Sequence, residues 1–165
     1  MKAGAQPSAS TSAGATDAGS VRMTASEIFE QCRDACERIE ELTFAIDNGG
    51  GQRRGEPTHG GGISDPTASR AIYLAEKMPE LIAERDELTA YVGECMRLVN
   101  GICIAFTQEY AACVEMRYID CMNVCDIADE LGISPGTVRN RISTAFDYID
   151  AVGLHRAALG IGIAE

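Results

Sequence analysis

Residues 124–142 read VCDIADELGISPGTVRNRI, and this stretch decides the fold of the C-terminal part of the chain. Ala128 is small where a second helix must cross closely, Gly132 follows four positions later, and Val138 six positions after that. Glycine accepts the positive φ that ends one helix sharply before the next begins. These steric requirements occur together in register, so the stretch predicts a helix-turn-helix.

Cap signals set the limits of three short helices around this motif. The first helix is expected from about Gln108 to Tyr118. The second begins at Asn123, with Asp126 in a partial capping box, and ends at Gly132. The third begins at the N-cap Ser134, with Pro135 as its first helical residue, and runs to about residue 150.

The outer face of the third helix carries the candidate site. At about 100° per residue, Val138, Ile142, Ala145, Phe146 and Ile149 form the inner face, and small polar residues form the opposite ridge. Such a ridge suits the major groove of double-stranded DNA: asparagine can pair with adenine, threonine can meet a thymine methyl group, and arginine can contact phosphates. The candidate DNA-binding residues are Ser134, Gly136, Thr137, Arg139, Asn140, Arg141 and Thr144. The alternative is a helical unit that contacts only protein.

The charge is unevenly distributed along the chain. The 165 residues have a formal net charge of −11, which argues against a general polyanion binder. Residues 131–146, however, hold two arginines and no acidic residue, a local charge of +2. The acidity therefore argues against strong non-specific binding, but it leaves specific DNA recognition open.

The preceding region, residues 26–105, predicts a long helical hairpin. Ser26 is the expected N-cap of the first helix, and Asp65-Pro66 the start of the second, with Pro79 kinking or dividing it. Apolar residues recur at alternating spacings of four and three in both helices, which is typical of lengthwise packing. The seams are Ile28, Cys32, Ala35, Ile39, Leu42 and Ile46, then Leu74, Met78, Leu81, Arg85, Leu88, Val92, Cys95, Val99 and Ile102. Surplus apolar surface would face a second copy, so we expect a homo-oligomer.

The remaining segments are a disordered N-terminal tail, a loop and a C-terminal tail that stays unassigned. Residues 1–25 are low-complexity and too poor in large apolar side chains to fold. The glycine-rich stretch 48–64 is a loop by composition, and residues 151–165 form a tail to which the pattern assigns no structure. The fold class is therefore all-α, with a hairpin at 26–105 followed by a helix-turn-helix domain at 106–150.

No pattern of catalytic residues is present, and an enzyme is not expected. The seven cysteines include the pairs Cys32/Cys36 and Cys121/Cys125, whose spacing of four could bring thiolates to one helix face for zinc. Because Cys32 lies on an apolar seam, packing is the preferred interpretation. We expect no cofactor and no metal. Without a signal sequence or membrane-spanning stretch, a cytoplasmic location is expected.

The residues 110–149 resemble region 4 of bacterial sigma factors. Met116-Arg117-Tyr118, Asp126-Ile127-Ala128, Leu131-Gly132-Ile133-Ser134 and Thr137-Val138 follow the family pattern in order, and Arg139 and Arg141 lie where its recognition helix carries basic residues. One departure is Cys121, at a turn position where the family usually has glycine. The resemblance implies DNA binding. A basic surface of RNA polymerase is a further candidate partner, for the acidic faces of the preceding helices.

The hairpin, with Asp65-Pro66-Thr67 at its second helix, resembles phage transcription regulators of the RinA/ArpU type. By analogy, the chain would regulate late or packaging genes of a phage or prophage. Two alternatives stay open: a small terminase subunit that recognises DNA for packaging, and a sigma-like module that binds RNA polymerase without touching DNA.

Overall fold

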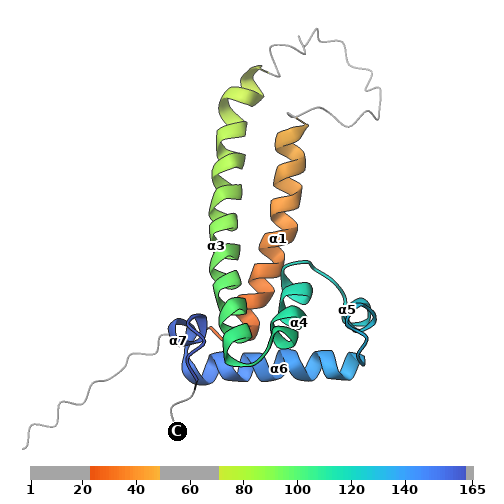
Figure 1. Ribbon diagram of the computed structural model, residues 1–165. Coiled ribbons are helices and arrows are strands. Elements are labelled where there is room, and N and C mark those ends of the chain that lie inside the picture. The colour runs from red at the N-terminus through yellow and green to blue at the C-terminus, as the bar shows by residue number, and fades with distance from the viewer. Residues whose placement is uncertain (1–22, 49–70, 163–165) are drawn as a thin grey trace, which may run out of the picture.

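The computed structural model describes residues 23–48 and 71–162, and all regular structure in those ranges is helical, with no strand (Figure 1). The all-α prediction is confirmed. The elements are α1 (Ala25–Asp47), a π-helical turn η1 (Tyr73–Lys77), α3 (Met78–Ala105), α4 (Gln108–Tyr118), α5 (Val124–Leu131), α6 (Pro135–Val152) and α7 (Leu154–Ala158). No helix in these ranges is long and apolar enough to cross a membrane.

Helices α1 and α3 lie side by side and run in opposite directions, and together we call them the arm (Figure 1). The predicted seams face each other across the arm. Near its base they are buried, at Ile28, Cys32 and Ala35 of α1 and at Cys95, Val99 and Ile102 of α3. Toward the far end most seam residues are only half-buried, because no third helix covers them there.

The start of α1 differs from the prediction. Thr24, not Ser26, is the N-cap. The Thr24 hydroxyl accepts a hydrogen bond from the Glu27 amide (3.3 Å), and the Glu27 carboxylate accepts one from the Thr24 amide (2.7 Å). This reciprocal pair of hydrogen bonds is a capping box. It satisfies two backbone amides at once, which favours Thr24 as the N-cap over Ser26, two residues later.

Pro79 lies where the second helical segment changes from π-helical to α-helical. It is in the first turn of α3, directly after the π-helical turn Tyr73–Lys77. Helical backbone continues without a break from residue 71 to residue 105, so the proline distorts this segment and does not divide it. The expected tail up to residue 22, most of the loop 48–64 and the Asp65-Pro66 helix start lie outside the described residues.

The base of the arm and the C-terminal helices share one buried core. The Phe29 ring of α1 stacks on Phe146 of α6, with 5.2 Å between centroids, and lies 5.7 Å from the Tyr118 ring of α4. The Ala25 amide also donates a 2.7 Å hydrogen bond to the Asp150 carboxylate of α6. Helix α6 thus crosses the foot of the arm and is fixed to it (Figure 1). The division into two domains at residues 26–105 and 106–150 stays a prediction.

The C-terminal segment is more ordered than the sequence indicates. Helix α6 continues to Val152, and α7 then folds back onto α3. A Cβ at Gly101 of α3 would lie 1.8 Å from the Ala157 carbonyl oxygen, so only glycine permits this approach. Tyr148 donates a 2.9 Å hydrogen bond to the Ile161 carbonyl and fixes the chain after α7. The sequence pattern left residues 151–165 unassigned, and the structure places the end of α6 and the short helix α7 there.

Candidate nucleic-acid interface

The turn between α5 and α6 has the geometry that its residues predict. The Asn123 side chain accepts hydrogen bonds from the amides of Cys125 (2.9 Å) and Asp126 (3.0 Å), which caps α5. Gly132 ends α5 with φ of 63°, a left-handed conformation. The Ile133 amide then closes the turn on the Ala128 carbonyl (2.9 Å). The predicted helix limits at Asn123 and Gly132 are confirmed.

Two of the seven candidate site residues form the start of α6. The Ser134 hydroxyl accepts a 3.1 Å hydrogen bond from the Thr137 amide, and the two hydroxyls lie 2.9 Å apart. Pro135 occupies the first turn. Because these hydroxyls already bond each other, their evident role is to hold the first turn of α6 in place.

The inner and outer faces of α6 are those expected. Val138, Ile142, Ala145, Phe146 and Ile149 are buried, and the small polar residues opposite them are exposed. We call Gly136, Asn140 and Thr144 the ridge. Helices α1, α3 and α4 all lie on one side of α6, and the other side is bare (Figure 1). The ridge is therefore accessible along the whole first half of the helix.

The two arginines of α6 have different surroundings. Arg139 is exposed. The Arg141 side chain is only 18% exposed and forms an ion pair with Glu109 of α4. Its guanidinium also lies 5.7 Å from the centroid of the Tyr110 ring. Burial raises the pKa of the neighbouring Cys113 thiol, and the Arg141 guanidinium offsets part of that rise.

A groove of about 510 Å³ runs beside α6 on the Arg139 side. Arg117 of α4, Arg139 and Ser143 line it together with Asp147 and Asp150. Arg117 is held by a 2.9 Å hydrogen bond from Nη1 to the Met122 carbonyl and by packing over the Tyr118 ring. The candidate residues did not include Arg117 or Ser143. Ser143 follows Arg139 by one helical turn, which was the available signal for it.

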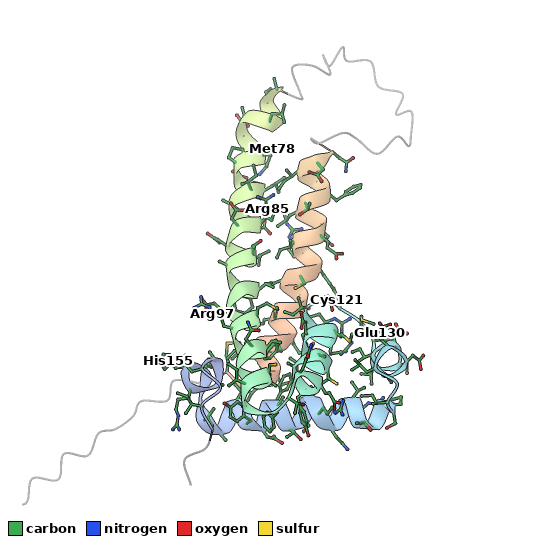
Figure 2. All side chains as sticks on the ribbon, in the orientation of Figure 1. Met78, Arg85, Arg97, Cys121, Glu130 and His155 are labelled. Carbon is green, nitrogen blue, oxygen red and sulfur yellow. The ribbon has the colours of Figure 1, made fainter. Side chains whose placement is uncertain are left out.

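The turn between α4 and α5 contains a non-glycine residue in a glycine conformation. Cys121 has φ of 56°, and it lies beside α1 (Figure 2), with its thiol 3.9 Å from the Arg33 carbonyl oxygen. The turn thus keeps the left-handed geometry that glycine usually provides. The departure from glycine at this position therefore gives a strained residue and not a different turn.

The seven cysteines are all free thiols. Cys32, Cys95 and Cys113 are buried, and the Cys95 thiol together with burial raises the pKa of Cys32. Within residues 23–48 and 71–162, no group of three or more Cys, His, Asp or Glu side chains is placed to hold a metal ion. The buried thiols pack as small apolar groups.

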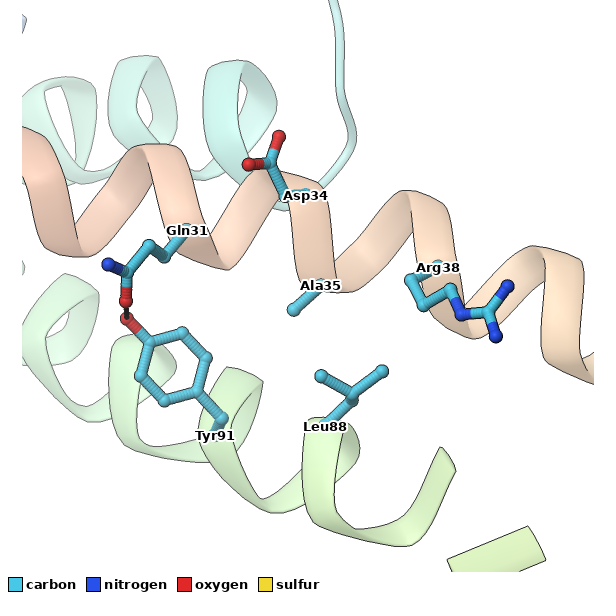
Figure 3. Close-up of a pocket in the computed structure, with 6 residues that line it drawn as sticks. All are labelled: Gln31, Asp34, Ala35, Arg38, Leu88 and Tyr91. Carbon is cyan, nitrogen blue, oxygen red and sulfur yellow. Dashed lines mark hydrogen bonds between the residues drawn. The ribbon is translucent and has the colours of Figure 1, made fainter. Parts of the chain in front are cut away.

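A second hollow, of about 360 Å³, lies midway along the arm (Figure 3). Ala35 of α1 leaves space there opposite Leu88 and Tyr91 of α3. The Tyr91 hydroxyl donates to the Ile28 carbonyl (3.0 Å), and burial raises the pKa of Tyr91 to about 12. The hollow is mainly apolar and open, and its lining does not suggest catalysis.

Residues 107–147, about a quarter of the chain, match the family model of sigma-70 region 4. No curated protein and no solved structure matches the chain. The match spans α4, α5 and the first two-thirds of α6, the elements that form the turn and the ridge. It indicates a DNA-binding role in transcription, and this family is not one of enzymes. The C-terminal part of this chain is a sigma region 4-like helix-turn-helix domain.

Proposed function

We propose that this protein is a sequence-specific regulator of transcription that binds promoter DNA through α6. The observation that carries the proposal is the exposed ridge of Gly136, Asn140 and Thr144 within a region 4-like domain. A helix whose polar face is bare, and whose first turn is fixed by its own caps, can enter the major groove without reorganising.

Each residue of the ridge has a role in this proposal. Asn140 pairs with an adenine edge, and Thr144 packs its methyl group against a thymine. Gly136 lets the backbone of the first turn come close to the DNA. Exposed Arg139 contacts a phosphate, which sets the orientation of α6 without reading sequence.

The acidic arm fits the same arrangement. Helices α1 and α3 carry 12 acidic and 4 basic side chains. DNA would repel the arm, but the arm rises from the side of α6 opposite its bare face (Figure 1). The arm is therefore available to another protein while α6 is in contact with DNA.

We also propose that copies associate through the arm and that the protein belongs to a phage or prophage. Phe44 is 67% exposed and Ile72 57% exposed near the far end of the arm, where a second copy could cover them. Two linked domains would read half-sites about 10 base pairs, or a multiple, apart. The phage assignment is supported by the order of a helical hairpin before a region 4-like domain, as in RinA/ArpU-type regulators.

The test is binding to a labelled duplex taken from the DNA upstream of the protein's own gene. The double variant Arg139→Ala, Asn140→Ala is expected to lose at least tenfold in affinity, since each good base contact contributes about 1–3 kcal/mol. The matched control is Arg97→Ala, Asn100→Ala, which changes the same residue types at exposed positions of α3. Retained affinity in the first variant would exclude α6 as the reading helix.

The same preparations distinguish the two alternatives. A ring of about eight or more chains in native mass spectrometry, with binding confined to a packaging site, would indicate a terminase subunit. Co-purification with RNA polymerase, without salt-dependent affinity for DNA, would indicate a protein-only module.

A further inference from the structure

The two flanks of α6 differ in charge. Arg139 and Arg141 are two residues apart and so point about 200° from each other around the helix. Arg139 is exposed, whereas Arg141 is held on α4 by the Glu109 carboxylate. The Arg141 guanidinium also packs over Tyr110, whose ring stacks on Phe106 with centroids 5.1 Å apart. Arg141 is therefore attached to the domain core at several points.

The ion pair changes what this flank presents to a phosphate. The Glu109 side chain is 67% exposed and Arg141 only 18% exposed, so the carboxylate is the more accessible charge of the two. A DNA strand approaching here would meet an arginine whose charge is already neutralised. Pulling Arg141 away would leave Glu109 beside the phosphate, which is unfavourable.

The opposite flank has a different composition. Arg117 of α4 and Arg139 of α6 line one groove there, together with the exposed Ser143 of α6. Asp147 and Asp150 lie at the C-terminal end of this groove, and Asp150 is hydrogen-bonded to the Ala25 amide. The cationic part of the groove is thus confined to the first half of α6, next to the ridge.

We propose that Glu109 is a positioning residue that neutralises Arg141, so that the domain grips the DNA backbone only from the Arg117 and Arg139 flank. The inference rests on the proposed function, because it concerns how the same helix docks. Two consequences follow. Arg141 fixes α6 to α4 without adding a phosphate contact. Glu109 disfavours any docking in which the DNA backbone passes along the α4 side of α6.

The salt dependence of DNA affinity tests this directly. Each phosphate contact steepens the slope of log affinity against log salt by about 0.9 for duplex DNA. The probes are a 30-base-pair duplex from upstream of the protein's own gene and a random duplex of equal length. Affinities are measured by fluorescence anisotropy between 50 and 200 mM salt, a range over which one contact amounts to about a 3.5-fold change.

The two arginines are expected to differ in how much each contributes to the salt dependence. Arg139→Ala should reduce the slope by about 0.9, whereas Arg141→Met, which keeps the packing over Tyr110, should leave it unchanged. Glu109→Gln keeps the size of the side chain and removes its charge, so it should steepen the slope by about 0.9 and tighten binding at 50 mM salt. Adding Arg141→Met to Glu109→Gln should restore the original slope.

Glu87→Gln is the matched control, because it removes one negative charge from an exposed position on the arm, far from α6. An equal steepening in Glu87→Gln would show an effect of net charge and overturn the inference. An unchanged slope in Glu109→Gln, or a loss in Arg141→Met equal to that in Arg139→Ala, would also overturn it. If the unmodified protein binds neither duplex, the proposed function itself fails.

Discussion

At the scale of single residues, local chemistry predicts most helix ends of this domain. Asn123, Gly132 and Ser134 occupy the cap positions that their side chains favour, and their hydrogen bonds are as expected. Thr24 was missed because Ser26 is also a good cap, and the choice depends on the reciprocal bond with Glu27. The Glu109–Arg141 pair could not be predicted, since its two residues are 32 positions apart in sequence and lie on different helices.

Cys121 provides a residue-scale test of backbone strain. Its φ of 56° costs an L-residue about 1–2 kcal/mol, which glycine avoids. Its thiol contributes only long contacts to the carbonyl oxygens of Arg33 (3.9 Å) and Ile119 (3.8 Å). In urea titrations, we expect the free energy of unfolding of the Cys121→Gly variant to be about 1 kcal/mol higher than that of the Cys121→Ala variant. Equal stability of the two variants would show that the turn is not strained.

Thiol reactivity tests the packing interpretation of the cysteines. Cys103 and Cys125 are exposed, so two of the seven thiols should react rapidly with Ellman's reagent in the native protein. Burial raises the pKa of Cys36 and of Cys121, which lowers their thiolate fraction, and the remaining three are buried. These five should react only slowly until the protein unfolds. One equivalent of bound zinc, with protected thiols released by a chelator, would contradict the packing interpretation.

At the scale of elements, hydrophobic spacing predicts long helices well and short ones poorly. The seams of α1 and α3 span many turns, so their periodicity is clear. Along these helices, most seam side chains are buried or half-buried in the structure. Helix α7 has only five residues, and its one buried side chain is Ala157. Its stability comes from docking on Gly101 and from the Tyr148 hydroxyl, and neither contact leaves a periodic signal. The tail was therefore not recognisable as a helix.

Two glycines of α3 make the docking of α7 testable. Gly101 faces the Ala157 carbonyl at a distance that excludes a Cβ, while nothing lies within 4 Å of the Cβ position at Gly93. Gly101→Ala must displace α7 and should lower the free energy of unfolding by about 1–3 kcal/mol. Gly93→Ala should instead raise it by about 0.5–1 kcal/mol, as alanine does inside a helix. Equal effects of the two substitutions in thermal melts would show that α7 is not docked.

At the scale of the whole molecule, acidic and basic side chains are unevenly distributed between the arm and α6. The arm carries 12 acidic against 4 basic side chains, whereas the first half of α6 carries arginine without acid. The sequence predicts this separation because charge can be counted along the chain. It does not predict the direction of the arm, which depends on the contacts of Phe29 with Phe146 and of Ala25 with Asp150. Those contacts place the acidic arm on the side of α6 away from its bare face.

Association and DNA binding should therefore respond to salt in opposite directions. Two acidic arms repel each other at low ionic strength, where the Debye length is long, and salt screens that repulsion. Apolar contact at Phe44 and Ile72 then favours the oligomer, since both side chains are largely exposed in the single chain. In sedimentation equilibrium, self-association should strengthen between 50 and 500 mM salt, while affinity for a duplex falls over the same range.

The variant Phe44→Glu, Ile72→Glu separates the two effects. It adds charge to the arm and removes the apolar surface, so it should remain monomeric at every salt concentration. Its α6 is unchanged, and a single domain should still bind a half-site, with the weaker affinity of one copy. The matched control Ile104→Glu, Leu159→Glu alters exposed apolar residues near α7, far from the end of the arm, and should leave association intact. If the control dissociates and the arm variant does not, the contact between copies lies at α7 instead.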